Sequence, residues 1–302
     1  MKIIIDKHFY DFAVKTFPDI NFFTEPEHCP EAEALIGPPE LMSVEILEKL
    51  PKLRWLQLFR AGYDMIDIEY IRKRGIILTN GKDIFSIPIA EDVVCKILMH
   101  NTNAFKYIEN KKSRIWDNKL NRTELRGQTV GIVGTGSIAT EIAKRLKPFD
   151  VKLIGHKRTP VLSMPYFDEI YSGKKGLEYV MSVSDYIIVT ADLNKSTYHM
   201  INKDNLKLMK ETASIINIAR GSIINQIDLT EALKNKTIDY AGLDVFEVEP
   251  LPEDDKLWDA DNAYLTPHVS AIVKNNKLRW KILIEQNIKN FVDNEKLINV
   301  VS

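Results

Sequence analysis

Short apolar, β-branched runs alternate with amphipathic stretches along most of the chain, and these runs form two series. This alternation is typical of α/β proteins that contain parallel sheets. The first series of predicted strands comprises residues 2–5, 20–23, 34–37, 55–59 and 76–80. The second series comprises residues 129–133, 151–155, 186–190, 214–218, 240–245 and 263–266.

Amphipathic segments occupy the spaces between these strands, with helices expected at residues 43–50, 137–146, 177–182, 203–208 and 226–234. The run AEDVVCKILM at residues 90–99 is apolar on most sides, so we expect a buried helix with Cys95 in the core. The six strands of the second series, with helices between them, match the plan of a doubly wound Rossmann domain.

The last amphipathic stretch, residues 274–292, follows the second series and has no strands of its own to cover. The simplest topology therefore has the chain leave a first domain, build a second one and return. We expect a flavodoxin-like substrate domain from residues 1–97 and 273–302, with a dinucleotide-binding Rossmann domain of residues 98–272 inserted into it. Two helices, about residues 88–107 and 274–292, would connect the domains as a hinge.

The composition excludes several classes of protein. A chain of 302 residues that is 45% hydrophobic is long enough for two ordinary domains. The 41 basic and 42 acidic residues give no electrostatic reason to expect nucleic acid or an anionic membrane as partner. No apolar run has the ~18–20 residues of a membrane span. Cys29 and Cys95 form no disulfide framework, and no His/Cys cluster has metal-ligand spacing. We expect a cytoplasmic protein without a metal.

The segment TVGIVGTGSIA has the form of a phosphate-binding turn, because a GxGxxA motif follows an apolar strand and opens an amphipathic helix. Gly134 would allow the tight turn, and Gly136 would let the backbone approach a pyrophosphate. The N–H groups of Ser137 and Ile138 would point at that anion from the helix N-terminus. Ala139 would let the helix lie close to the strand.

The residue at the end of the next strand indicates whether NAD or NADP is the cofactor. An acidic residue there would bind the ribose hydroxyls and repel a 2′-phosphate. The sequence instead places Lys157 at this position, followed by Arg158 and Thr159. Two cations and a hydroxyl fit a 2′-phosphate. We therefore expect NADP as the preferred cofactor, with NAD use also possible.

Three polar residues, Arg220, Glu249 and His268, follow three consecutive strands of the second series. The carboxyl ends of strands in an open α/β sheet face the ligand crevice. Ketone reduction needs a cation for the substrate carboxylate and carbonyl, which suits Arg220. It also needs a proton donor, which suits His268, and a carboxylate that stabilises the protonated imidazole, which suits Glu249.

Several segments, among them NIARGSIINQIDLTEAL, AGLDVFEVEPLP, LWDADNAYLTPHVSA and FRAGYDMID, resemble the signature blocks of the D-isomer-specific 2-hydroxyacid dehydrogenases. The similarity extends over nearly the whole chain. It implies catalysis by Arg220, Glu249 and His268, a substrate carboxylate held by the N–H groups of Ala61 and Gly62, and a homodimer. It also implies further cofactor contacts, at Thr197, Ile218 and Asp244.

The resemblance implies reduction of a small 2-keto acid, such as glyoxylate or hydroxypyruvate, by NADPH. Departures from the family pattern are Lys157 in place of an Asp, and Arg60 before the Ala61–Gly62 turn. Some relatives of this fold instead bind dinucleotide as sensors and act as interaction proteins or corepressors. A dinucleotide-sensing protein with little turnover is therefore the alternative reading.

Overall fold

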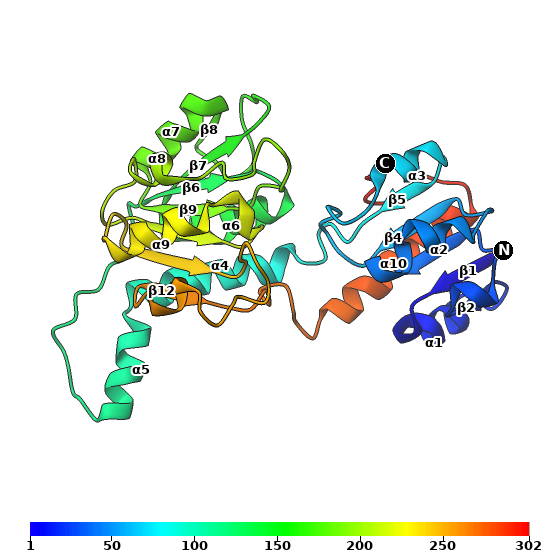
Figure 1. Cartoon of the computed structure of the whole chain (residues 1–302), viewed down its shortest axis with the longest axis horizontal. Coiled ribbons are helices and arrows are strands. Elements are labelled where there is room, and N and C mark those ends of the chain that lie inside the picture. Colours follow the sequence, from blue (N-terminus) through cyan, green and yellow to red (C-terminus); the bar gives the residue numbers. More distant parts are fainter. Residues whose placement is uncertain (302) are drawn as a thin grey trace. The chain divides into compact units, whose positions relative to one another are not determined.

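The computed structural model describes residues 1–301. The chain forms two compact units (Figure 1), one from Met1–Phe85 with Val273–Ser302 and the other from Ser86–Ile272. The predicted first domain extended to residue 97. The structure groups residues 86–97 with the second unit, because helix α4 (Ser86–Asn101) packs along helix α6 (Ser137–Leu146) of that unit.

The first unit contains a five-stranded, all-parallel sheet with the order β2-β1-β3-β4-β5. This is the flavodoxin-like order, so the predicted flavodoxin-like domain is confirmed. Its strands are β1 (Lys2–Ile5), β2 (Asn21–Phe23), β3 (Ala34–Gly37), β4 (Trp55–Leu58) and β5 (Ile77–Thr79). Its α-helices are α1 (Lys7–Thr16), α2 (Val44–Glu48), α3 (Ile68–Lys73) and α10 (Asn276–Val292), and the 3₁₀ turns are η1 (Pro26–His28) and η2 (Pro39–Met42).

Helix α10 brings the end of the chain back onto the first sheet. Its buried residues Trp280, Ile284 and Phe291 share a core with Ile3 and Trp55. The Trp55 and Phe291 rings lie 5.1 Å apart between centroids. The first unit is therefore completed only by the last part of the chain.

The second unit contains a seven-stranded, all-parallel sheet with the order β12-β11-β10-β9-β6-β7-β8. The strands are β6 (Thr129–Val133), β7 (Lys152–Lys157), β8 (Glu169–Ser172), β9 (Tyr186–Val189), β10 (Ser214–Asn217), β11 (Tyr240–Leu243) and β12 (Ala263–Leu265). Counted from β6, this is the doubly wound order 3-2-1-4-5-6 with a seventh strand at one edge. The predicted Rossmann domain is confirmed, although the sequence analysis expected six strands and not seven. Edge strand β8 was missed, because its residues EIYS are all half-buried and form no apolar run.

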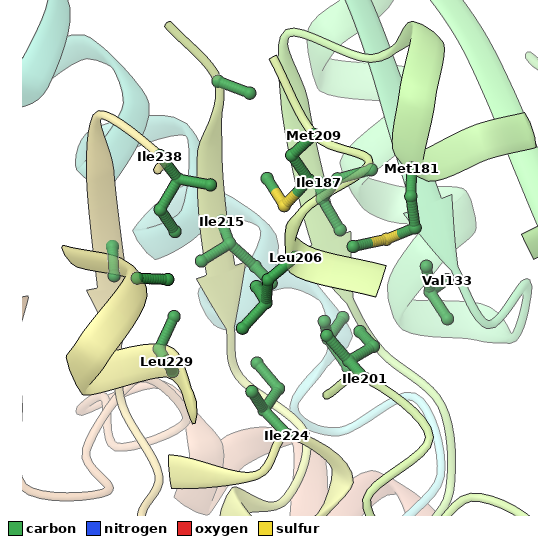
Figure 2. Close-up of a cluster of buried hydrophobic side chains, with 14 of the residues drawn as sticks. Val133, Met181, Ile187, Ile201, Leu206, Met209, Ile215, Ile224, Leu229 and Ile238 are labelled. Carbon is green, nitrogen blue, oxygen red and sulfur yellow. The ribbon is translucent and has the colours of Figure 1, made fainter. Parts of the chain in front are cut away.

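The second unit also contains α5 (Ala104–Ser113), α7 (Gly173–Val183), α8 (Lys203–Leu206), α9 (Gln226–Lys234), η3 (Lys147–Phe149), η4 (Gly221–Ile223) and η5 (Lys256–Asp259). One large apolar core lies between the sheet and the helices that cover it. Figure 2 shows part of this core, where Ile187 and Ile215 of adjacent strands meet Leu206 and Leu229 of the helices. The core fixes the strand ends on which the functional loops are built.

Two predictions for residues 86–113 were wrong. A single helix over residues 88–107 was expected, but α4 ends at Asn101 and α5 begins at Ala104, because Asn103 is left-handed with φ 55°. Cys95 was expected in the core, but it is exposed, while Lys96 is fully buried. No helix within residues 1–301 is long and apolar enough to cross a membrane.

Candidate active site

The predicted phosphate-binding turn joins β6 to α6 with the expected backbone. Gly134 has φ 97°, and a methyl group there would come within 2.5 Å of the Ala191 backbone nitrogen. A methyl group at Gly136, in contrast, would meet nothing within 4 Å. Ala139 is fully buried against the sheet. The turn therefore leaves open space above Gly136, beside the N-terminal N–H groups of α6, which a helix cannot itself satisfy.

These features fit a bound pyrophosphate, since N–H donors and the positive end of the α6 dipole converge at one concave turn. A second helix begins beside it. Ser86, the buried first residue of α4, lies with its hydroxyl 3.2 Å from that of Ser137, the first residue of α6. The sequence analysis missed Ser86, because it lies 51 residues before Ser137 in the chain.

Strand β7 brings the predicted 2′-phosphate residues next to this turn. The N–H of Gly134 donates to the carbonyl of His156 at 2.9 Å. Lys157 is half-buried at the end of β7, and Arg158 and Thr159 are exposed. His156 instead faces the core, where burial lowers the pKa of its imidazole. The basic residues at 157 and 158 therefore follow directly after the residue that binds the Gly134 turn.

Arg220 lies on a turn that is fixed by the last residue of β10. The side chain of Asn217, which is 1% exposed, donates to the Arg220 carbonyl at 3.0 Å and accepts from the Ala219 N–H at 3.1 Å. The Arg220 guanidinium donates to the Ala219 carbonyl at 2.7 Å. Sequence reasoning missed Asn217, although a polar residue that ends an apolar strand is a signal for such a turn.

Glu249 and His268 form a pair across the ends of β11 and β12, two adjacent strands. The Nδ1–H group of His268 donates to Glu249 Oε2 at 2.7 Å, because a carboxylate can only accept. The other oxygen, Oε1, accepts from the Phe246 N–H at 3.0 Å. The imidazole is thus held by Nδ1, while Nε2 stays available for a substrate. A histidine held in this way is suited to proton donation.

His268 itself has left-handed backbone geometry, with φ 53°, which is rare for a residue with a side chain. Asp244 holds this turn in place. Its fully buried carboxylate accepts from the Thr266 hydroxyl at 2.6 Å and from the N–H groups of Val269 and Ser270, each at 3.0 Å. The Asp244 carbonyl also accepts from the His268 N–H at 2.8 Å.

These contacts give Asp244 a positioning role that the sequence analysis did not foresee. Its carboxylate was expected to contact the cofactor, and three of its roughly four acceptor sites are used within the protein.

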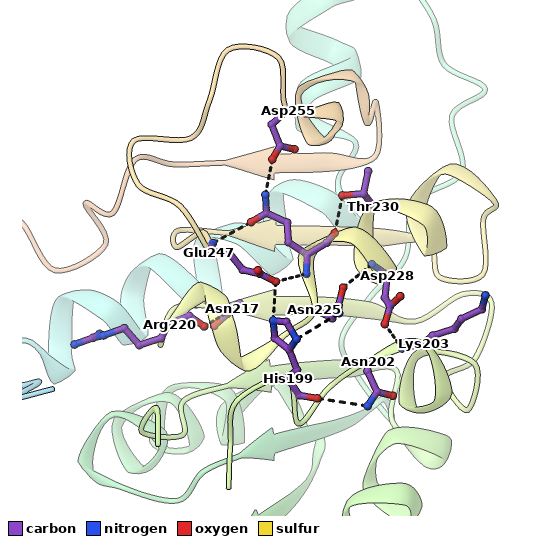
Figure 3. Close-up of polar contacts among 11 residues, drawn as sticks. His199, Asn202, Lys203, Asn217, Arg220, Asn225, Asp228, Thr230, Glu247 and Asp255 are labelled. Atoms are coloured by element: carbon purple, nitrogen blue, oxygen red, sulfur yellow. Dashed lines mark hydrogen bonds and ion pairs between the residues drawn. The ribbon is translucent and has the colours of Figure 1, made fainter. Parts of the chain in front are cut away.

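A second carboxylate, Glu247, ties together the loops that follow β9, β10 and β11 (Figure 3). Its Oε1 accepts from the Gln226 N–H at 2.7 Å and lies 3.0 Å from His199 Nε2. The Gln226 side chain accepts in turn from the Glu247 N–H at 3.0 Å. Because Glu247 directly follows Phe246, this network also fixes the backbone that binds Glu249.

The other predicted binding residues are Thr197 and Ile218 in the second unit and Ala61 and Gly62 in the first. Ile218 is buried at the end of β10, and the Thr197 hydroxyl closes its own loop by donating to the Asp192 carbonyl at 2.7 Å. In the first unit, Asn80 donates to the Ala61 carbonyl at 2.6 Å. The N–H groups of Ala61 and Gly62 have no hydrogen-bond partner within residues 1–301. In the same part of the chain, no group of three or more His, Cys, Asp or Glu residues could hold a metal ion.

A doubly wound sheet with a dinucleotide turn and a His–Glu pair at its carboxyl edge is the arrangement expected of a nicotinamide-dependent oxidoreductase. Residues 94–270 match the model of the D-isomer specific 2-hydroxyacid dehydrogenase NAD-binding domain. A glyoxylate reductase of Pyrococcus horikoshii is 36% identical over 250 residues, which cover 80% of this chain and 74% of that protein.

Solved structures agree with this match. A D-isomer specific 2-hydroxyacid dehydrogenase family protein from Aeromonas salmonicida superposes with a TM-score of 0.87 and is 29% identical, over 100% of this chain and 98% of that one. An NADPH-dependent glyoxylate/hydroxypyruvate reductase from Sinorhizobium meliloti gives a TM-score of 0.81 at 26% identity, over 100% and 97%.

The chain belongs to the D-isomer specific 2-hydroxyacid dehydrogenase family. It is an oxidoreductase that acts on 2-hydroxy acids or 2-keto acids with a nicotinamide dinucleotide.

Proposed function

We propose that the enzyme reduces a small 2-keto acid, such as glyoxylate or hydroxypyruvate, with NADPH as the preferred reductant. The observation that carries this proposal is the 2.7 Å contact between His268 Nδ1 and Glu249, on the sheet edge that also carries Arg220. The relatives that are described as glyoxylate reductases support the choice of substrate. The Sinorhizobium protein, described as NADPH-dependent, supports the choice of cofactor.

In this proposal Arg220 binds the substrate carboxylate and polarises the keto oxygen, since a guanidinium can form two parallel hydrogen bonds. The N–H groups of Ala61 and Gly62 bind the same carboxylate. His268 donates a proton from Nε2 to the keto oxygen, and Glu249 stabilises the imidazolium before the transfer. The nicotinamide, when bound, supplies the hydride to the carbonyl carbon.

In this proposal the cofactor is held at the turn after β6 and at the end of β7. The N–H groups of Ser137 and Ile138 would bind the pyrophosphate, beside the open space above Gly136. Lys157, Arg158 and Thr159 would bind the 2′-phosphate at the end of β7. We assign Thr197, Ile218 and Asp244 to the ribose and nicotinamide side of the site, following the family resemblance.

We also propose that the enzyme is a cytoplasmic homodimer. Helix α5 and the segment after it expose several large apolar side chains: Tyr107, Ile108, Ile115 and Trp116, of which Trp116 is 96% exposed. Apolar side chains gathered in this way are typical of a protein interface. Light scattering of the purified protein, with Trp116→Ser as the interface variant, tests this assignment.

The proposal is tested by mixing the purified protein with NADPH and a panel of 2-keto acids and following the nicotinamide absorbance. Turnover of about 1 per second or faster with glyoxylate or hydroxypyruvate supports it. The alternative, a dinucleotide sensor, predicts tight NADPH binding without turnover on any substrate. Turnover with larger 2-keto acids alone would support 2-keto acid reduction but would overturn the assignment of a small substrate.

A further inference from the structure

Lys96 is fully buried in the middle of α4, where the sequence predicted an apolar face. Its ammonium group lies 2.5 Å from Asp92 Oδ2, one helical turn earlier, and 5.2 Å from the centre of the Tyr264 ring. A buried ion pair is costly to desolvate, and replacing it by apolar residues often leaves stability unchanged or improves it. The pair therefore needs an explanation other than stability.

The pair lies against the strand that leads into Asp244. A methyl group at Gly242 of β11 would come within 3.2 Å of Lys96 Cδ, so the missing side chain makes room for the lysine. Asp244 is two residues further along and faces the same side of the chain. Four residues of a helix and two residues of a strand rise by similar distances. The step from Lys96 back to Asp92 along α4 therefore matches the step from Gly242 to Asp244 along β11. Asp92 thus lies near Asp244.

The electrostatics of Asp92 agree with this geometry. Its pKa is raised above the ordinary value, chiefly by burial and further by the negative charge of Asp244. The hydrogen bond and the charge of Lys96 act in the opposite direction and lower this pKa. Asp92 therefore interacts with a cation, Lys96, and with a second carboxylate, Asp244, in the interior of the second unit.

Other titratable groups around the pair do not replace that ammonium ion. Tyr240 of β11 and Tyr264 of β12 have pKa values raised by burial, so both stay neutral in the working range. Cys95 of α4 is exposed and lies close enough to affect both tyrosines. On helix α6, Arg145 pairs with Glu141 and lies 3.6 Å from Glu91 of α4.

We propose that Lys96 is a positioning residue for His268. Its ammonium ion holds the Asp92 carboxylate beside Asp244, and Asp244 in turn fixes the loop from which His268 projects. Both Asp244 oxygens accept hydrogen bonds from that loop, so any neighbouring group that donates to Asp244 competes with the loop. Lys96 acts on the reaction only through this chain of contacts.

Removal of the ammonium ion has a defined consequence. Without the cation, Asp92 keeps the two causes that raise its pKa, burial and the charge of Asp244, and loses the two that lower it, so it takes up a proton more readily. The O–H group of protonated Asp92 can then donate to an Asp244 oxygen, and it competes with the loop for Asp244. The loop around His268 loosens at the pH values where Asp92 binds this proton, and tightens again when Asp92 is replaced by a residue that has no hydrogen-bond donor.

The experiment compares four proteins: wild type, Lys96→Met, the double variant Asp92→Leu with Lys96→Met, and Lys106→Met. Lys106 lies on the neighbouring helix α5, where it pairs with Glu109 on the surface, and its loss controls for the removal of one charge. For each protein, kcat/KM for glyoxylate with NADPH is measured from pH 5.5 to pH 9. Hydrogen exchange of the Val269 and Ser270 amides is measured over the same range.

For Lys96→Met we expect kcat/KM to fall about tenfold at pH 6 and less at pH 8.5, the effect of a pKa shift of about one unit. The Val269 and Ser270 amides should exchange faster at acid pH. In the double variant both readouts should return to within about twofold of wild type. Packing alone predicts no such rescue, because the double variant lacks the same lysine.

The proposal fails if Lys96→Met has the wild-type pH profile and exchange rates, or if the double variant is as impaired as the single one. If Lys96→Met does not fold, the double variant alone tests the proposal. The proposal requires this variant to be active and to protect its Val269 and Ser270 amides from hydrogen exchange. The kinetic readout rests on the proposed function, but hydrogen exchange needs no substrate. A wild-type protein without turnover would therefore overturn the proposed function and leave this inference testable.

Discussion

Gly221 packs directly against the peptide that follows Phe246: a methyl group at Gly221 would lie 2.1 Å from the Phe246 carbonyl oxygen. The N–H group of the same Phe246 binds Glu249. The turn that carries Arg220 and the turn that positions Glu249 are therefore in contact through their backbones. A shift in either turn is transmitted to the other.

This contact predicts the effect of Gly221→Ala. The methyl group can be accommodated only if the backbone at residues 246–247 moves, so the free energy of unfolding should fall by about 1–3 kcal/mol. kcat should also fall, since Glu249 loses its position. Gly136→Ala is the matched control, because its methyl group meets only open space. It should unfold like wild type but bind the cofactor more weakly. Urea unfolding and cofactor titration separate the two outcomes.

Replacement of His268 by Asn should abolish proton donation while leaving the dinucleotide turn intact. We expect kcat to fall by about 10²–10⁴-fold, the usual contribution of a general acid, with little change in the Kd for NADPH. Stopped-flow turnover and fluorescence titration measure these quantities. His8→Asn, which alters an exposed histidine paired with Asp6 in the first unit, is the control. Wild-type turnover in the His268 variant would show that another group donates the proton.

The double substitution Lys157→Asp with Arg158→Ala should reverse the cofactor preference. Each charge-assisted contact with a 2′-phosphate is worth about 1.5–3 kcal/mol before screening, and exposure of Arg158 favours the lower end. NADPH should therefore bind at least about tenfold more weakly, and NADH equally well or better. Raised salt should weaken NADPH binding more than NADH binding in wild type. Equal efficiency of wild type with both cofactors would contradict the assignment.

Stability should depend on pH through His156. Burial lowers the pKa of this imidazole in the folded protein, so the unfolded chain binds a proton more readily. Its contribution to stability is fully present above the unfolded pKa of about 6.5 and is lost as pH falls below that value. The free energy of unfolding should therefore decrease from pH 7 to pH 5, by at most about 1.4 kcal/mol per pH unit for one proton. His156→Gln should show a flatter profile in urea unfolding at several pH values.

Most of the fold could be predicted because buried parallel strands are continuous apolar runs, which the sequence displays directly. The edge strand β8 escaped notice for the same reason, since an edge strand need not be apolar. The break between α4 and α5 depends on the left-handed backbone of Asn103, a residue type that tolerates this conformation, and the pattern of apolar positions in residues 88–107 does not mark it.

The assignment of Cys95 and Lys96 failed for a different reason. Two adjacent residues on a helix point about 100° apart, and hydrophobicity alone favoured the cysteine as the buried one. Lys96 is buried because Asp92 and Gly242 supply a charge and a space, and Gly242 is 146 positions away in the chain. The roles of Asn217 and Asp244 were likewise hidden, because each depends on which backbone groups the fold brings to its side chain.

The return of α10 to the first sheet has a consequence for synthesis on the ribosome. Residues of the first unit emerge early, but Trp280, Ile284 and Phe291, which complete their core, emerge last. The second unit is continuous in sequence, so it can fold while the first sheet still waits for its final helix. During that interval the sheet surface around Ile3 and Trp55 is open to water and to other chains. We expect nascent chains of this enzyme to depend on chaperones until the last turn of α10 has left the ribosome.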